Sequence, residues 1–139
     1  MTYPEAVRAE LAMLCRELDM DSALVSEIIG GREVVRWAAG DGEYGSVSAA
    51  LEDTICARLL DGRIGSVVGD TTKEPSLNRL EAVRDRSIGA YIGVPFTTAD
   101  ARLYVLCCLA REARPDLGAA DVRFLRGMAE GVRSHLESR

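Results

Sequence analysis

With 139 residues, 47% of them hydrophobic and 28% charged, the chain suits one folded domain spanning residues 1–139 and is too apolar to be disordered. Its formal net charge of −5 disfavours nonspecific binding to nucleic acids, which requires a basic face. The arginines of the last third alternate with acidic residues, as on a solvated helix face, so no nucleic-acid partner is expected.

The first half of the chain predicts a helix, a pair of strands and a second helix. Residues 3–18 place apolar side chains at spacings of three and four, which is typical of an amphipathic helix. Residues 23–29 and 33–39 have the composition of strands and are joined by two glycines, so we expect a hairpin. After a glycine-rich loop, a helix is predicted over residues 51–60, with Ser48 as its cap.

The second half predicts three more strands and two more helices. A short strand is expected over residues 66–68, and a short helix within residues 77–84. Residues 90–96 and 103–110 are almost continuously apolar, so both faces of these strands should be covered. The last helix runs from residue 119 to about residue 137.

This last helix carries a row of apolar residues at alternating spacings of three and four: Val122, Leu125, Ala129, Val132 and Leu136. A heptad-like row of this kind suits a partner helix. We therefore predict a homodimer that forms through the terminal helices.

The order of the elements predicts the fold class. Hairpins require antiparallel pairing, and helices before, between and after the strands can cover both faces of a sheet. We therefore expect an α+β fold with one central antiparallel sheet and helices on both of its faces.

The cysteines, the histidine and the start of the chain exclude several kinds of site. Cys15, Cys56, Cys107 and Cys108 form no C-x-x-C pair and His135 stands near the end, so no metal site is expected. The first residues lack the basic and apolar segments of an export signal, and no apolar run reaches the roughly 20 residues that span a bilayer. We expect a cytoplasmic protein with free thiols and no membrane partner.

Six short motifs follow one another between residues 53 and 125. They are Asp53-Thr54-Ile55-Cys56, Asp70, Tyr91-Ile92-Gly93-Val94-Pro95, Leu106-Cys107, Arg114-Pro115-Asp116-Leu117 and Asp121-Val122-Arg123-Phe124-Leu125. In this order they resemble one subgroup of GAF domains, which has an acidic-Ser/Thr-x-Cys helix, a Tyr-x-Gly-Val-Pro strand and a Leu-Cys strand. The resemblance covers roughly residues 6–136 and departs at residues 101–105, where the subgroup has glycines.

The resemblance implies a six-stranded antiparallel sheet with a ligand pocket on one face, under the middle helices. It also implies that the terminal helices cover the other face and pair into a dimer bundle. GAF domains usually regulate an output domain such as a histidine kinase, a cyclic-dinucleotide enzyme or a transcription regulator. We therefore expect a sensor without catalytic residues, which responds to an unidentified small molecule and acts on an output domain in cis or in trans.

Six side chains are the candidates for ligand contact: Trp37, Tyr44, Cys56, Asp70, Tyr91 and Tyr104. Trp and Tyr combine an apolar body with a polar tip, which suits the orientation of a small ligand. Structural alternatives stand beside this interpretation, with Trp37 as a core residue and Asp70 as a turn former. Tyr91 and Gly93 share one face of their strand, so Gly93 leaves space either for a ligand beside Tyr91 or for a closely packed helix.

Two other functions remain open. One is a thiol-based redox sensor or reductase centred on Cys56, although this residue lies beyond the first turn of its predicted helix and has acidic neighbours that oppose a thiolate. GAF-type free methionine sulfoxide reductases need a pair of nearby cysteines, which the spacing does not reveal, and Cys107 and Cys108 should point to opposite faces. The other is a dimerisation domain whose pocket is filled by side chains. The residue after Cys56 is Ala57, where bilin-binding relatives have His, and the cofactor stays unidentified.

Overall fold

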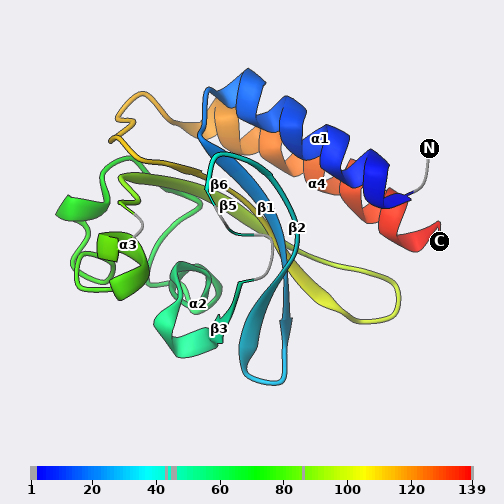
Figure 1. The fold of residues 1–139 in the computed structure, drawn as a ribbon, viewed down its shortest axis with the longest axis horizontal. Helices are drawn as coiled ribbons and strands as arrows, with labels where there is room; N and C mark the ends of the chain where they lie inside the picture. Colours follow the sequence, from blue (N-terminus) through cyan, green and yellow to red (C-terminus); the bar gives the residue numbers. More distant parts are fainter. Residues whose placement is uncertain (1–2, 43, 45–46, 86, 139) are drawn as a thin grey trace.

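The chain folds into a six-stranded antiparallel sheet with helices on both faces, which confirms the predicted fold class (Figure 1). The computed structural model describes residues 3–42, 44, 47–85 and 87–138. In chain order its elements, with two 3₁₀ turns η1 and η2, are α1 (Tyr3–Leu18), β1 (Ser22–Ile29), β2 (Arg32–Gly40), β3 (Ser48–Ala50), η1 (Leu51–Asp53), α2 (Ile55–Leu60), β4 (Val67–Val68), η2 (Thr71–Lys73), α3 (Glu81–Asp85), β5 (Ala90–Thr97), β6 (Leu103–Ala110) and α4 (Ala119–Glu137).

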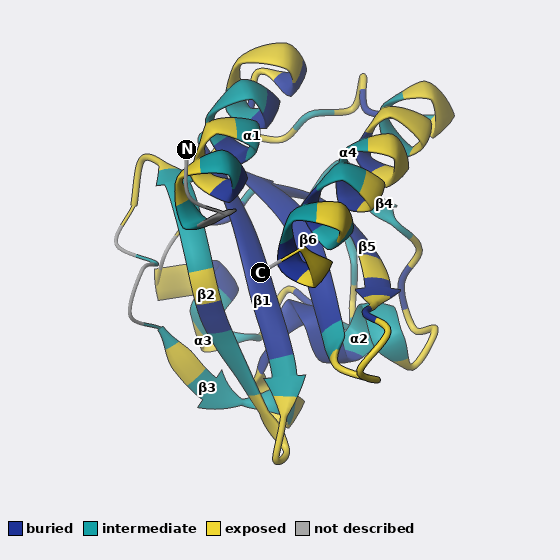
Figure 2. Ribbon diagram, turned by 90° about the vertical axis from the view of Figure 1, so that its right-hand side faces the viewer, coloured by how far each residue is buried: buried dark blue, intermediate teal, exposed yellow. Residues whose placement is uncertain are grey.

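The centre of the sheet is formed by β1 and β6, which come from opposite ends of the chain. The strand order is β3-β2-β1-β6-β5-β4, and every neighbouring pair is antiparallel. The pairing of β1 with β6 runs from Ser22 opposite Leu109 to Ile28 opposite Leu103. Both strands are almost continuously buried, because other elements cover them on both sides (Figure 2).

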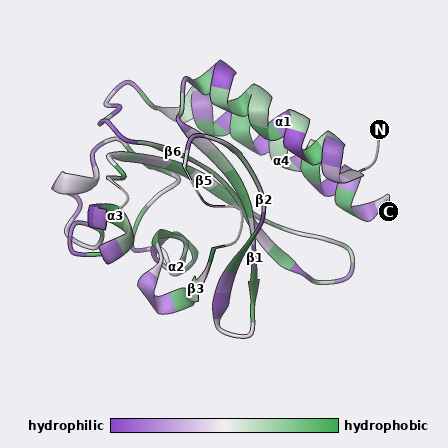
Figure 3. Cartoon of the chain, viewed as in Figure 1, coloured by the Kyte–Doolittle hydropathy of each residue, from purple (hydrophilic) through white to green (hydrophobic). Residues whose placement is uncertain are grey.

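On one face of the sheet, α1 and α4 lie side by side and run in opposite directions (Figure 1). Val7, Leu11 and Leu14 of α1 are fully buried in the core that these two helices form with the sheet. Figure 3 shows hydrophilic residues alternating with hydrophobic ones along both helices, whereas the central strands are mostly hydrophobic. One stripe of each helix therefore faces the sheet.

The apolar row of α4 packs inside the core of its own chain. Leu125, Ala129, Val132 and Leu136 are all at most 4% exposed, and they pack against the sheet and α1. The prediction that this row meets a helix of a second chain is therefore wrong. The error has a physical cause, since a helix that packs on a sheet needs the same spacing of apolar residues as a helix in a coiled coil.

The middle of the chain, from η1 to α3, covers the other face of the sheet through a second apolar core. Successive side chains of β6 point alternately into the two cores. Leu106 and Cys108 face the terminal helices, whereas Cys107 and Leu109 face the middle segment. The expectation that Cys107 and Cys108 point to opposite faces is confirmed.

The predicted helix over residues 51–60 is divided at Thr54. This residue is extended, and its Oγ1 accepts a hydrogen bond from the backbone N–H of Ala57 at 3.2 Å, so Thr54 is the N-cap of α2. Ser48, the predicted cap, lies instead in β3, opposite Val34 of β2. Cys56 is consequently in the first turn of α2 rather than beyond it.

Candidate ligand-binding site

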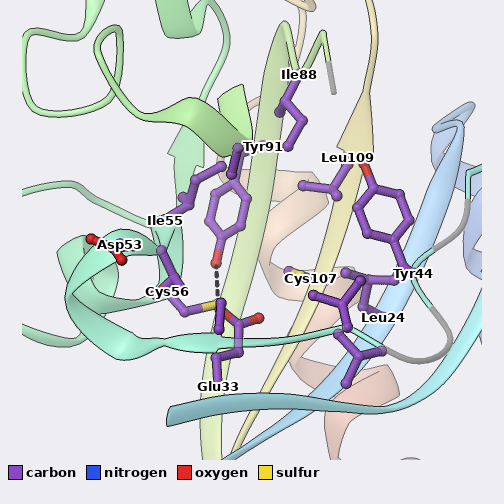
Figure 4. Close-up of a pocket in the computed structure, with 15 residues that line it drawn as sticks. Leu24, Glu33, Tyr44, Asp53, Ile55, Cys56, Ile88, Tyr91, Cys107 and Leu109 are labelled. Carbon is purple, nitrogen blue, oxygen red and sulfur yellow. Dashed lines mark hydrogen bonds between the residues drawn. The ribbon is translucent and has the colours of Figure 1, made fainter. Parts of the chain in front are cut away.

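A cavity of about 90 Å³ lies between the sheet and the middle segment (Figure 4). This is the face on which the resemblance implied a pocket. The lining side chains are Leu24, Glu33, Val35, Tyr44, Val47, Ala49, Asp53, Thr54, Ile55, Cys56, Ala82, Ile88, Tyr91, Cys107 and Leu109. Most of them are apolar, so the cavity is a hydrophobic hollow with a few polar groups.

Tyr91 reaches across from β5 to Cys56 of α2. Its hydroxyl lies 3.6 Å from the Cys56 sulfur, and its side chain is 1% exposed. Gly93 lies beneath the ring, because a Cβ placed there would stand 2.7 Å from Cζ of Tyr91. The space that Gly93 leaves open is therefore filled by Tyr91 itself, rather than by a ligand or a helix.

Cys107 brings a second thiol to this end of the cavity from β6, where it lies opposite Gly93 of β5. A hydrogen bond with Cys56, followed by burial, raises the pKa of Cys107 well above its usual value. Burial first, and then the neighbouring Cys56, raises the pKa of Tyr91 in the same way. Cys107 and Tyr91 therefore keep their protons at neutral pH and offer neutral polar groups to the cavity.

Glu33 of β2 adds a carboxylate to this polar end. The hydroxyl of Ser26, a fully buried residue of β1, donates a hydrogen bond to Glu33 Oε2 at 2.8 Å. The charge of Glu33 is among the smaller causes that raise the pKa values of Tyr91 and Cys107. Asp53 is the second acid of the lining, and the lining that the structure describes contains no Arg, Lys or His. Glu33 therefore makes the polar end of the cavity negative, whereas Asp53 is exposed and points away from this end (Figure 4).

Three of the six predicted contact residues, Tyr44, Cys56 and Tyr91, line the cavity together. Figure 4 shows Cys56 and Tyr91 meeting at the polar end, whereas Tyr44 stands beside Leu109 and Leu24. Tyr91 is 35 residues from Cys56 in the sequence, and the fold brings it to the same hollow as Cys56 and Tyr44.

The other three predicted residues lie elsewhere. Asp70 is the N-cap of η2, and a hydrogen bond from the Thr72 hydroxyl at 2.6 Å is the main cause that lowers the pKa of Asp70. Tyr104 faces the terminal helices and stacks on Phe96, with 5.4 Å between the ring centroids. Trp37 also packs against the core under α1 and α4. None of these three side chains lines the cavity, so the six predicted contact residues do not share one pocket.

A bulge in β2 accounts for the position of Trp37. Val25 of β1 pairs with Trp37, but the next residue, Ser26, pairs with Val35, so Arg36 is an extra residue in the strand. Val35 consequently faces the cavity while Trp37 faces the opposite core, although the two are only two residues apart. Strict alternation along a strand cannot predict this reversal.

Two residues of the site, Glu33 and Cys107, were not among the predicted contacts. Because Cys107 and Cys108 are adjacent in a strand, the sequence predicted that their side chains point to opposite faces of the sheet. It did not show which of them faces the middle segment. Glu33 stands two residues before Val35 and so shares its face of β2, which is the signal that could have placed Glu33 in the cavity. The pair of neighbouring cysteines that the spacing did not reveal is thus formed by Cys56 and Cys107.

The later motifs of the resemblance have structural roles. Arg114 donates a hydrogen bond to the carbonyl of Leu18 at 3.0 Å and forms an ion pair with Asp116 at 2.8 Å. These contacts tie the segment before α4 to the end of α1. Asp121 accepts a hydrogen bond from the N–H of Gly118 at 2.9 Å and so closes the first turn of α4.

Residues 3–42, 44, 47–85 and 87–138 hold no group of three or more His, Cys, Asp or Glu side chains placed to bind a metal ion. Across the same residues, no helix combines the length and the apolar character needed to cross a membrane. All four cysteines are free thiols.

Several solved structures have the same fold as this chain. No protein-family model matches the sequence, and no curated protein matches it. The PixJ GAF domain of Thermosynechococcus elongatus, in its blue-light absorbing form, is similar with a TM-score of 0.79 at 14% identity, over 98% of this chain and 85% of that one. The GAF domain of an Acinetobacter phosphoenolpyruvate-protein phosphotransferase has a TM-score of 0.76 at 13% identity, over 99% and 84%.

An enzyme shares the same architecture. The free methionine-R-sulfoxide reductase of Neisseria meningitidis, solved in complex with its substrate, has a TM-score of 0.75 at 14% identity, over 97% of this chain and 78% of that one. Identities this low establish a common fold and leave the ligand and the activity undecided. The sheet order, the helical layers and these similarities show that the chain has the GAF fold.

Proposed function

We propose that the chain is a regulatory module that binds a small molecule in its cavity and controls an output domain, either linked to it or in a partner protein. Solved structures with this fold include GAF domains of the receptor PixJ and of a phosphotransferase, which supports a sensory role.

The observation that carries the proposal is the cavity itself. Apolar walls surround it, and Tyr91, Cys56 and Cys107 bring polar groups to one end, which is the usual composition of a small-molecule site. Its volume of about 90 Å³ is below the roughly 150 Å³ that accommodates benzene in an engineered apolar cavity. A ligand that fits without rearrangement therefore has about four or five non-hydrogen atoms.

The central strands offer a route from the cavity to the terminal helices. β6 places Cys107 and Leu109 in the cavity wall and Leu106 and Cys108 under α1 and α4. A ligand changes the helices only if it binds one arrangement of these strands better than another. The close packing of both cores supports such coupling, because a shift of one face of a strand moves the other.

Two matched substitutions on β3 test whether ligands enter this cavity. Ala49 lines it and Ala50, the next residue of the same strand, does not. We expect compounds of a fragment screen to shift the amide NMR signals of Tyr91 and Cys107, and we expect Ala49→Leu, but not Ala50→Leu, to abolish these shifts. The proposal is contradicted if no compound of the screen binds, or if the compounds bind the Ala49→Leu protein as they bind the wild type.

The alternative of a thiol-based sensor or reductase is favoured by one observation, the meeting of Cys56 and Cys107. The raised pKa of Cys107 opposes it, since the thiolate is the reactive form. Alkylation at neutral pH separates the two functions, and we expect both thiols to react only after unfolding. A Cys56–Cys107 disulfide formed by hydrogen peroxide, with two thiol hydrogens lost and the peroxide reduced to water, would favour the alternative.

We also propose that the module acts as a homodimer in the cytoplasm, through the outer surfaces of its terminal helices. The inner row of α4 is occupied by the chain's own core, but Phe124 on the same helix is 39% exposed. Free thiols at all four cysteine positions agree with a reducing compartment.

A further inference from the structure

We propose that the cavity selects small molecules that carry an ammonium group on a short apolar body. This inference rests on the proposed ligand-binding function and adds the chemical class of the ligand. It is carried by the distribution of charge and of hydrogen-bond acceptors around the hollow.

The apolar part of the cavity suits a short hydrocarbon body. Leu24, Val35, Ile55 and Leu109 form its walls, and their contact with water is replaced by contact with a ligand when one binds. The volume of about 90 Å³ limits this body to a few carbon atoms.

The polar end of the cavity is built to receive a positive charge. Glu33 is held toward it by the hydrogen bond from the buried Ser26 hydroxyl at 2.8 Å. A carboxylate has acceptor sites for several hydrogen bonds, so the bond from Ser26 leaves Glu33 able to accept from a ligand. Figure 4 shows the Glu33 carboxylate at the same end of the cavity as the Tyr91 hydroxyl and the Cys56 sulfur.

An ammonium group matches this set of atoms. It has three N–H donors and no acceptor, while Glu33, Tyr91 and Cys56 all carry atoms that accept hydrogen bonds. A carboxylate or phosphate ligand, in contrast, would meet the charge of Glu33 without any Arg, Lys or His in the described lining to offset it. The same field that favours a cation therefore excludes anions.

Three probes with five non-hydrogen atoms each test the selection: isobutylammonium, isobutanol and propionate. Each is titrated into the wild-type protein at neutral pH while the amide signals of Tyr91 and Cys107 are followed by NMR. We expect isobutylammonium to bind about tenfold more tightly than isobutanol, because hydrogen bonds to charged groups are the stronger ones. Propionate should not bind.

Two variants assign the preference to one side chain. Glu33→Gln keeps an acceptor for Ser26 but removes the charge, and it should bring isobutylammonium and isobutanol to within about twofold of each other. Asp53→Asn is the matched control, because Asp53 also lines the cavity but is exposed. The control should retain most of the preference.

The outcomes separate the two levels of the proposal. If isobutanol binds the wild type as tightly as isobutylammonium, or if Glu33→Gln leaves the preference intact, the ammonium selection is overturned while the binding function stands. If none of the three probes and no fragment binds, both proposals fail together.

Discussion

The absence of a side chain at Gly93 leaves room for the Tyr91 ring at the polar end of the cavity. A methyl group there would stand 2.7 Å from Cζ of Tyr91, and the far end of the ring already contacts Cys56. We expect Gly93→Ala to lower the free energy of unfolding by about 1–3 kcal/mol through overpacking. Urea unfolding measures the loss, and the contact between Tyr91 and Cys56 should lengthen.

Gly127 provides the control for this substitution. It lies within α4, and no described atom beyond its own helix stands within 4 Å of where its Cβ would be. Gly127→Ala should therefore raise the free energy of unfolding by about 0.5–1 kcal/mol through helix propensity. Equal stabilisation by the two substitutions would show that the Tyr91 ring does not lie over Gly93.

The buried thiol and phenol predict a loss of stability at alkaline pH. Folding raises the pKa of Cys107 and of Tyr91 above their ordinary values of 9.0 and 10.0, so the folded state holds these protons more tightly than the unfolded state. The resulting stabilisation is complete below about pH 9 and is lost as the pH rises, by up to about 1.4 kcal/mol per pH unit for each group.

Unfolding in urea at several alkaline pH values measures this slope. Cys107→Ala should make the slope shallower, because one titrating group is removed. Val105→Ala is the control, since Val105 is fully buried in the same core but does not titrate, and it should lower stability without altering the slope. Identical slopes for all three proteins would rule out this role of Cys107.

At the scale of secondary-structure elements, the position of α2 depends on its cap. Thr54 Oγ1 accepts from the N–H of Ala57 at 3.2 Å and donates to the carbonyl of Leu51 at 2.7 Å, which joins η1 to α2. Thr54→Ala should cost about 1 kcal/mol and should weaken the binding of isobutylammonium, because α2 carries Cys56. Thr54→Ser keeps the hydroxyl and should be nearly neutral in both assays.

A result in which Thr54→Ala and Thr54→Ser lose the same stability would attribute the effect to the methyl group instead of the cap. Thermal unfolding followed by circular dichroism distinguishes these cases. Since α2 has only six residues, its cap accounts for a large share of its local stability.

At the scale of the whole molecule, α4 has an inner row that holds the fold and an outer surface that is free to meet a partner. Leu125 is fully buried, whereas the adjacent Phe124 is 39% exposed. Leu125→Asp should prevent folding, because an isolated charge would be placed in the core at a cost of more than about 4 kcal/mol. Phe124→Asp should change stability by no more than about 1 kcal/mol.

Size-exclusion chromatography with light scattering then reports on the proposed homodimer. Phe124→Asp should shift the protein toward the monomer while its circular dichroism spectrum stays native. A folded Leu125→Asp protein would contradict the packing of α4, and an unchanged dimer in Phe124→Asp would place the interface away from this surface.

The sequence by itself determined the fold class, the long helices, the four long strands and the motifs that led to the GAF fold. Residues 3–18 and 119–137 were recognisable from apolar residues at spacings of three and four, and residues 90–96 and 103–110 from almost continuous apolar runs, because both patterns are local properties of the chain. The opposite orientation of Cys107 and Cys108 followed from the same alternation. These features need no knowledge of distant contacts.

Only the tertiary structure decided which residues meet in the cavity. The β2 bulge turned Trp37 away from it, the pairing of β5 with β6 brought Cys107 opposite Gly93, and Ser26 directed Glu33 toward the polar end. The apolar row of α4 likewise met the chain's own sheet rather than a second copy. Spacing along the chain determines which side chains share a face, but the register between strands and the partner that covers a face depend on contacts between segments far apart in sequence.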